Sequence, residues 1–311
     1  MFTVLGIALF ATTLGIMTEH NRSVSQVPEL EYPFPTSSLT VEGIRIAYFD
    51  SGKGKKVLLF VHGLGSNASF WRYNVAAFSD KYRVLAIDLP GYGKSEKLNV
   101  CVSMHSYARV LAGFLQQLKV SKVNLVGHSM GGQISITFAF LYQSMVECLV
   151  LAAPAGIETF TQEEALALKQ YFSATNVKAT DEHLIRQNIV NNFFIWDDRF
   201  EWLLQQRLAM RSAPDFDGYC NAIEQGIRAM LDEPVRQRLS EILPSVLVIF
   251  GEEDRLIPNQ FFHPGRAESV ARIAQQEIHK AWLKMIPRAG HLLMIEQPEV
   301  FNRVVREFLD Q

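Results

Sequence analysis

Short, nearly continuous runs of apolar residues recur along the chain from Lys55 onward, and each ends in glycine, proline or polar residues. A run of this kind is typical of a strand that is buried on both faces, as in a parallel sheet. Six segments show the pattern: "KKVLLFVHG", "YRVLAIDLPG", "KVNLVGHS", "VECLVLAAPAG", "SVLVIFGEED" and "AWLKMIPRAG". Before them, "SLTVEG" and "IRIAYFDSG" alternate apolar and polar residues around a glycine, which predicts a β hairpin.

Helical patterns lie between several of these runs. In "SYARVLAGFLQQL" the apolar residues fall on one helical face, and the same spacing recurs from Phe301 to Leu309, after Pro298. Strands that alternate with helices are joined by crossover connections, which place helices on both faces of a mostly parallel sheet. We therefore predict an α/β fold with its chemistry at the carboxyl ends of the strands.

The alternation is interrupted once, between about Ile157 and Ser240, where helical patterns occur without a convincing buried strand. In "TQEEALALKQYF" a threonine followed by acidic residues predicts a helix start. We interpret residues 157–240 as a helical cap inserted into an α/β core formed by residues 36–156 and 241–311.

Residues 1–35 differ from the rest of the chain. "MFTVLGIALFATTLGIM" precedes the first charged residue, Glu19, and as a helix it would span about 25 Å. We interpret residues 1–17 as a signal peptide or a membrane anchor, with a buried N-terminal helix as the alternative. The chain would then be exported or membrane-associated, on a side that the sequence does not fix. "NRSVSQVPELEYPFPTSS" is typical of a linker, which places the start of the folded domain near Thr36.

Composition excludes several classes of function. The chain has 311 residues, 48% hydrophobic and 20% charged, with a formal net charge of -2 and no long run of basic residues, so we expect no nucleic-acid partner. Cys101, Cys148 and Cys220 are odd in number and lack C-x-x-C spacing, which argues against a zinc site and a disulfide framework. We predict neither a metal nor a cofactor.

The candidate chemistry centres on Ser129 in "GHSMG", between two glycines at the end of a predicted strand. A serine hydroxyl is a poor nucleophile unless a base lies within hydrogen-bonding distance and a third group orients that base. Asp254 and His291 follow two later strands, and the order Ser129, Asp254, His291 is typical of a nucleophile-elbow hydrolase. The alternative is that Ser129 only caps a helix.

Five motifs in a fixed order resemble those of α/β-hydrolase fold serine hydrolases. They are "VHGLGSNASFW", "DLPGYGKS", "VGHSMGG", "GEEDRLIP" and "AGH", and the resemblance extends from Ser37 to the C-terminus except for the cap. The similarity is greatest to capped esterases and lipases of the monoacylglycerol-lipase-like kind.

The resemblance implies a role for each residue. Ser129 would attack a carbonyl carbon, His291 would accept and return the proton, and Asp254 would orient the imidazole. The backbone N–H groups of Leu64 and Met130 would form the oxyanion hole. We expect Asp88, His62 and His128 to organise loops rather than to transfer protons.

A serine at position 129 disfavours the haloalkane dehalogenases and epoxide hydrolases of this fold, because those enzymes use a carboxylate nucleophile. We predict hydrolysis of a lipophilic carboxylic ester through an acyl-enzyme, with some of the cap's large apolar residues lining the pocket. Three alternatives stay open: hydrolysis of a C–C bond in a vinylogous diketone, lyase or amidase chemistry, and a ligand-binding relative without turnover. The cap residues considered for the pocket are Phe172, Phe193, Phe194, Trp196, Phe200, Trp202, Met210 and Phe216.

Overall fold

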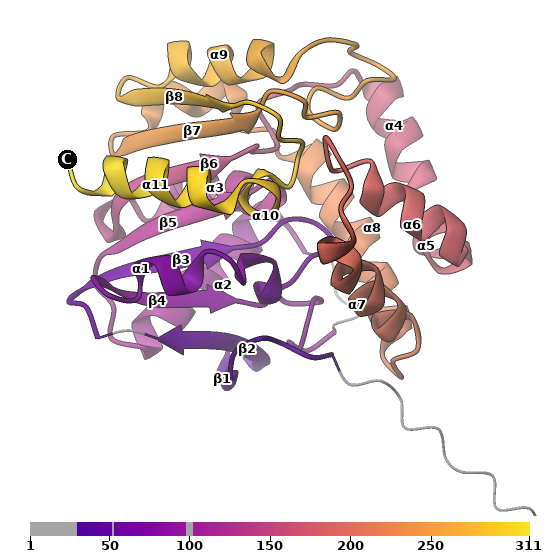
Figure 1. Cartoon of the computed structure of the whole chain (residues 1–311), viewed down its shortest axis with the longest axis horizontal. Helices are drawn as coiled ribbons and strands as arrows, with labels where there is room; N and C mark the ends of the chain where they lie inside the picture. Colours follow the sequence, from indigo (N-terminus) through magenta and orange to yellow (C-terminus); the bar gives the residue numbers. More distant parts are fainter. Residues whose placement is uncertain (1–29, 52, 98–101) are drawn as a thin grey trace, which may run out of the picture.

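The computed structural model describes residues 30–51, 53–97 and 102–311. An eight-stranded sheet with the order β1-β2-β4-β3-β5-β6-β7-β8 lies between layers of helices (Figure 1). The hairpin strands β1 and β2 are antiparallel, β2 is antiparallel to β4, and the remaining neighbours are parallel. The strands are β1 (Ser37–Val41), β2 (Ile44–Ser51), β3 (Lys56–Val61), β4 (Tyr82–Ile87), β5 (Val123–His128), β6 (Val146–Ala152), β7 (Ser245–Gly251) and β8 (Ala281–Ile286).

The burial of the strands follows the sequence pattern that predicted them. All six residues of β5 are buried, because β5 lies at the centre of the sheet between β3 and β6. The edge strand β1 is mostly exposed, and buried and exposed positions alternate only weakly along it. The predicted hairpin and the mostly parallel sheet are both confirmed.

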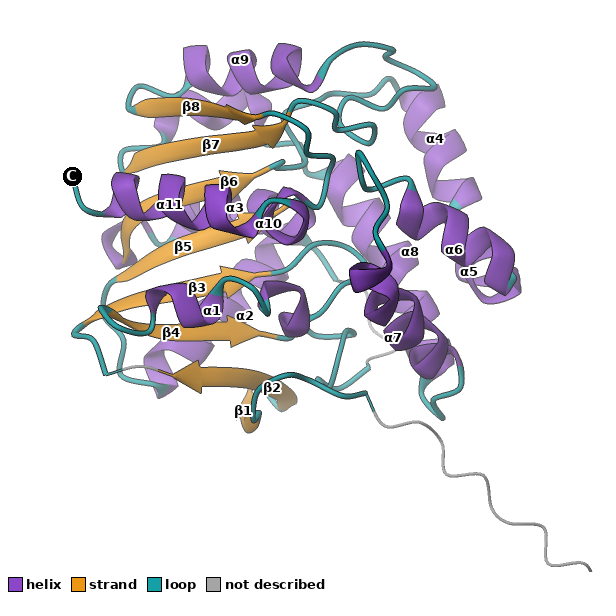
Figure 2. Cartoon of the chain, viewed as in Figure 1, coloured by secondary structure: helices purple, strands orange, loops and turns teal. Residues whose placement is uncertain are grey.

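Helices cover both faces of the sheet (Figure 2). A capping box formed by Ser103 and Ser106 starts α2, and Pro298 occupies the first turn of α11, where its missing N–H costs nothing. Phe301, Val304, Val305 and Phe308 of α11 are buried, as their spacing predicts. The core helices are α1 (Val75–Phe78), α2 (Met104–Gln117), α3 (Met130–Leu141), α9 (Ala267–Glu277), α10 (Leu293–Glu296) and α11 (Pro298–Leu309).

Five further helices lie between β6 and β7 and gather beyond the carboxyl ends of the parallel strands (Figure 1). We refer to them as the cap. The first one starts as the sequence predicts, with Thr161 and Glu164 forming a capping box. The cap helices are α4 (Gln162–Tyr171), α5 (Ala174–Ala179), α6 (Glu182–Val190), α7 (Glu201–Arg211) and α8 (Phe216–Asp232), with short turns η3 (Asp198–Phe200) and η4 (Arg236–Glu241) beside them. The division of the chain into separate units at residues 157 and 240 stays a prediction.

The predicted hydrophobic segment at residues 1–17 lies outside the described residues. Within the ranges that the structure describes, no helix is both long and apolar enough to cross a membrane. Packing against the core begins before Thr36. The ring centroids of Phe34 and Phe49 lie 4.2 Å apart, and the Tyr32 hydroxyl donates a hydrogen bond to Asp88. The C-terminal part of the predicted linker is therefore part of the folded structure.

Candidate active site

Ser129 occupies a strained turn between β5 and α3. Its φ of 53° and ψ of -118° lie in a region that residues with side chains rarely adopt. The turn is tight: a Cβ on Gly127 would lie 2.4 Å from the Gly131 carbonyl oxygen, and one on Gly131 would lie 2.3 Å from the Val61 carbonyl oxygen. The hydroxyl of Ser129 makes no capping hydrogen bond to α3, so the helix-cap role considered from the sequence does not apply.

His291 and Asp254 follow the neighbouring strands β8 and β7, and their side chains meet in the interior. Nδ1 of His291 lies 2.8 Å from Oδ2 of Asp254, with 5% and 0% of the two side chains exposed. Oδ1 of Asp254 accepts hydrogen bonds from the N–H groups of Leu256 and Ile257 at 2.8 and 3.2 Å. The carboxylate is thus fixed in position, and it fixes the imidazole so that Nδ1 donates to it.

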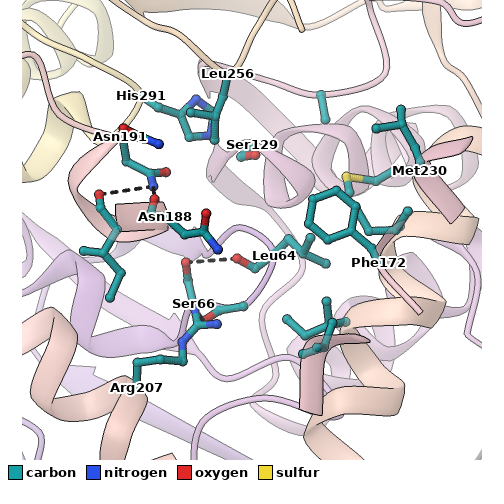
Figure 3. A pocket seen from close by; sticks show the side chains of 18 of the residues that line it. Leu64, Ser66, Ser129, Phe172, Asn188, Asn191, Arg207, Met230, Leu256 and His291 are labelled. Carbon is teal, nitrogen blue, oxygen red and sulfur yellow. Dashed lines mark hydrogen bonds between the residues drawn. The ribbon is translucent and has the colours of Figure 1, made fainter. Parts of the chain in front are cut away.

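Ser129 and His291 both line one large pocket, and Figure 3 shows the two side chains near each other on its wall. Met130 is the first residue of α3, so its N–H has no partner within the helix. Leu64 follows β3 and also lines the pocket. A Cβ on Gly63 would lie 3.1 Å from Cβ of Ser129, which brings the Leu64 loop next to the nucleophile. The oxyanion hole formed by Leu64 and Met130 stays a prediction.

Two cap residues hold the loop that follows Leu64. The guanidinium of Arg207 on α7 donates to the Gly65 carbonyl at 2.7 Å, and the Tyr219 hydroxyl on α8 donates to the same oxygen at 3.1 Å. The position of Leu64 therefore depends on how the cap packs against the core.

The buried histidines His62 and His128 support backbone loops, which agrees with the interpretation from the sequence. Nδ1 of His62 donates to the Gly63 carbonyl at 2.8 Å, while Nε2 accepts from the Leu89 N–H at 3.0 Å. Burial lowers the pKa of His62 to about 4. Nε2 of His128 donates to the His291 carbonyl at 3.0 Å, and burial and the nearby His291 ring hold the pKa of His128 well below its ordinary value. Both rings are neutral at pH 7.

Asp88 links several loops and does not line the pocket. Its Oδ1 accepts from the Ala68 N–H at 2.7 Å, and its Oδ2 accepts from the Tyr32 hydroxyl and the Lys94 N–H, each at 2.7 Å. Burial raises the pKa of this carboxyl group, and the two N–H donors oppose the rise. These contacts support the predicted structural role.

The pocket has a volume of about 1310 Å³ and lies between the core and the cap. Figure 3 shows a polar side with Ser66, Asn188 and Arg207, and an apolar side with Phe172 and Met230. A ligand that fills both sides would have to be amphipathic.

Five of the eight large apolar cap residues fall into two groups. Phe193 and Phe200 are buried and stack with their ring centroids 4.5 Å apart, so they form the cap's own interior. Phe172, Met210 and Phe216 line the pocket instead. The sequence suggested both possibilities and did not separate them.

Sequence reasoning missed two polar residues. Arg207 lines the pocket, and no carboxylate lies within ion-pair distance of it among the described residues. Glu296 is 6% exposed and contacts both the His291 loop and the cap. A single carboxylate inside the apolar stretch "HLLMIEQP" was the available signal for Glu296.

The described part of the chain contains no cluster of three His, Cys, Asp or Glu side chains that could bind a metal.

The sheet topology, the elbow at Ser129 and the carboxylate–histidine pair define a hydrolase built on a parallel α/β sheet. Residues 56–298 match the family described as alpha/beta hydrolase fold, and the chain belongs to this family.

Three similar proteins illustrate its range. A 2-hydroxy-6-oxononadienedioate/2-hydroxy-6-oxononatrienedioate hydrolase of Burkholderia vietnamiensis is 34% identical, over 86% of this chain and 91% of its own. A structure described as a "probable hydrolytic enzyme" from Pseudomonas aeruginosa PAO1 is 25% identical, with a TM-score of 0.81 over 89% of this chain and 95% of its own. A thermophilic esterase from Thermogutta terrifontis is 25% identical, with a TM-score of 0.72 over 89% and 98% of the two chains.

Proposed function

We propose that this hydrolase uses Ser129 as a nucleophile, His291 as the general base and acid, and Asp254 as the group that orients the imidazole. The observation that carries the proposal is the buried His291–Asp254 hydrogen bond at two neighbouring strand ends, beside a strained serine on the same pocket wall. Nε2 of His291 takes the proton of Ser129 Oγ as the oxygen attacks a carbonyl carbon. The acyl-enzyme is then hydrolysed by water, with His291 again acting as the base.

The negative oxygen formed in each step needs hydrogen-bond donors. We assign this role to the N–H groups of Leu64 and Met130; the assignment is supported by the place of Leu64 on the pocket wall and of Met130 directly after Ser129. One such donor contributes about 3 kcal/mol to the transition state in enzymes of this type. Anchoring of Gly65 by Arg207 and Tyr219 keeps the Leu64 N–H preorganised.

We further propose that the bond cleaved is a C–C bond next to a ketone in a conjugated, carboxylate-bearing substrate. The Burkholderia relative, which this chain matches over nearly its whole length, is named for hydrolysis of such a dienedioate. Arg207 adds an observation from the pocket itself: its guanidinium faces the cavity without a protein carboxylate as partner in the described structure. A substrate carboxylate on the polar side would provide that partner.

In this reaction the dienol first tautomerises, moving its hydroxyl proton to the carbon next to the ketone that Ser129 attacks. The electron pair of the broken C–C bond then passes into the resulting enone, whose oxygen takes up a proton. The other fragment leaves Ser129 as a carboxylic acid after water attacks the acyl-enzyme. The net change is the addition of one water molecule across the C–C bond. Asn188 and Ser66 on the polar side offer further hydrogen bonds to oxygen atoms of the substrate (Figure 3).

Hydrolysis of a lipophilic ester is the second candidate, and the apolar side of the pocket supports it. Phe172 and Met230 form a surface suited to an acyl chain (Figure 3). The Thermogutta esterase has the same fold over nearly the same length. The same triad chemistry cleaves both kinds of bond, so the pocket decides between them.

Parallel kinetics on two substrate series separate the candidates. The first is 2-hydroxy-6-oxononadienedioate, followed by loss of its dienol absorbance, and the second is a set of p-nitrophenyl esters from C2 to C16. The proposal predicts a kcat/KM for the dienedioate at least about 100-fold above that for the best ester, a difference of about 3 kcal/mol in transition-state binding. A best ester that exceeds the dienedioate would favour the esterase instead, and the preferred chain length would then report the depth of the apolar side.

A further inference from the structure

Glu296, the last residue of α10, places a buried carboxylate between the core and the cap. Oε2 accepts a hydrogen bond from the Gly290 N–H at 2.8 Å and from the Phe194 N–H at 3.1 Å. Oε1 accepts from the Ile195 N–H at 2.9 Å. One carboxylate thus satisfies three backbone donors from two distant parts of the chain.

The two parts have different roles. Gly290 directly precedes His291, so its N–H belongs to the loop that carries the proposed base. Phe194 and Ile195 belong to the segment of the cap between α6 and η3. Hydrogen bonds from N–H groups to a buried carboxylate are charge-assisted and stronger than neutral ones, so this bridge strongly favours one relative position of the two segments.

Other contacts bring the same segments together. The Leu292 N–H donates to the Asn192 carbonyl at 3.2 Å, and a Cβ on Gly290 would lie 2.5 Å from that same oxygen. The guanidinium of Arg199 donates to the backbone carbonyl of Glu296 at 3.2 Å. The His291 loop is therefore enclosed on its cap side by residues 192–195.

We propose that Glu296 is a positioning residue that couples closure of the cap to correct placement of the His291 imidazole. When residues 192–195 rest on the core, Glu296 accepts their N–H groups and holds Gly290, which keeps Nε2 of His291 directed at Ser129. When this part of the cap lifts, two of the three donors leave and the His291 loop loses its restraint. The inference rests on the proposed role of His291 and adds a means by which the cap controls it.

The test replaces the carboxylate with an amide of nearly the same shape. In Glu296→Gln, one oxygen is exchanged for an NH₂ group that faces an N–H donor, so at least one of the three hydrogen bonds is lost. Glu299→Gln is the matched control, since Glu299 is exposed on the adjoining helix α11. We expect Glu296→Gln to lower kcat by about 10- to 100-fold with little change in KM, as expected of a misplaced catalytic group, and Glu299→Gln to leave both unchanged.

Hydrogen exchange measured without substrate tests the coupling itself. Peptides covering residues 190–196 and 286–292 should both exchange faster in Glu296→Gln, whereas peptides from the centre of the sheet, such as β5, should not change. Gly290→Ala tests the same coupling from the core side, because its Cβ would push against the Asn192 carbonyl. We expect this variant to show the same loss of kcat and the same faster hydrogen exchange in both peptides.

Each contrary result has a distinct meaning. If kcat falls while residues 190–196 keep their protection, Glu296 acts on the His291 loop alone and the coupling is wrong. Loosening of both peptides with unchanged kcat would show a purely structural bridge. A wild-type protein that neither turns over substrate nor reacts with a fluorophosphonate would overturn the proposed function, and this inference with it.

Discussion

Nδ1 of His291 lies 2.8 Å from Oδ2 of Asp254, although 37 positions separate the two residues in the sequence. The contact forms because β7 and β8 are parallel neighbours, so the loops at their carboxyl ends leave the sheet side by side. A buried carboxylate at this place fixes the tautomer of the imidazole and leaves Nε2 free for the pocket.

Replacing Asp254 with asparagine should nearly abolish turnover. An amide NH₂ group cannot accept a hydrogen bond from Nδ1 of His291, so the imidazole is left in the wrong tautomer and orientation. We expect kcat to fall by about 10³- to 10⁴-fold with a small change in KM. Steady-state kinetics on the preferred substrate measure this. Glu253→Gln, which alters the exposed neighbouring acid, should keep wild-type activity; an equal loss in both variants would show that the identity of the carboxylate was assigned wrongly.

Removing the charge of Arg207 should affect anionic substrates selectively. In Arg207→Gln we expect KM for the dienedioate to rise by about 10- to 100-fold, because a charge-assisted hydrogen bond to the substrate is lost. For a neutral p-nitrophenyl ester the change should be several-fold smaller and should reflect only the lost contact to the Gly65 carbonyl. Equal effects on both substrates would mean that Arg207 only supports the loop.

His62 should make the folded protein sensitive to acid. Burial lowers its pKa to about 4, whereas the unfolded chain binds a proton near the ordinary value of 6.5. Protonation therefore favours the unfolded state: the contribution to stability is complete above pH 6.5 and is lost as the pH falls toward 4, by up to about 3 kcal/mol.

Guanidinium unfolding at pH 7.5 and pH 4.5 measures this effect. His62→Gln should be less stable than wild type at pH 7.5, because the bonds to Gly63 and Leu89 are lost, but its stability should fall less on acidification. An identical pH dependence in the two proteins would show that His62 is not the group responsible.

The strained turn at Ser129 predicts a trade-off between stability and activity. Ser129→Gly should relieve the unfavourable φ and raise the free energy of unfolding by about 1 kcal/mol, while abolishing turnover. Ser129→Ala abolishes turnover as well but keeps a Cβ in the strained region, so it should be the less stable of the two. Thermal unfolding of both variants measures the difference. If alanine is the more stable, the strain does not reside in this residue.

The sequence was sufficient for the features that depend on local pattern. The continuous apolar runs predicted the parallel strands. Ser129, Asp254 and His291 each follow such a run, so their common location at the carboxyl edge of the sheet could be predicted. The threonine followed by acidic residues in "TQEEALALKQYF" predicted the start of the first cap helix for the same local reason.

The features that depend on the packing of the cap could not be foreseen. Arg207 lies on an amphipathic helix, where a charged residue ordinarily faces solvent, and only the approach of α7 to the Leu64 loop turns it toward the pocket. Two of the three N–H groups that donate to Glu296, those of Ile195 and Phe194, lie 101 and 102 positions away, beyond any local pattern. For the same reason the sequence could not separate the aromatic residues that line the pocket from those that fill the cap.

Covalent labelling tests the role of Ser129 most directly. The protein is treated with a fluorophosphonate, and the adduct is located by peptide mass spectrometry in wild type, Ser129→Ala and Asp254→Asn. We predict one adduct on Ser129 in wild type, none in Ser129→Ala, and strongly slowed labelling in Asp254→Asn. An adduct on another residue, or no adduct on a folded wild-type protein, would contradict the assignment of Ser129 as the nucleophile.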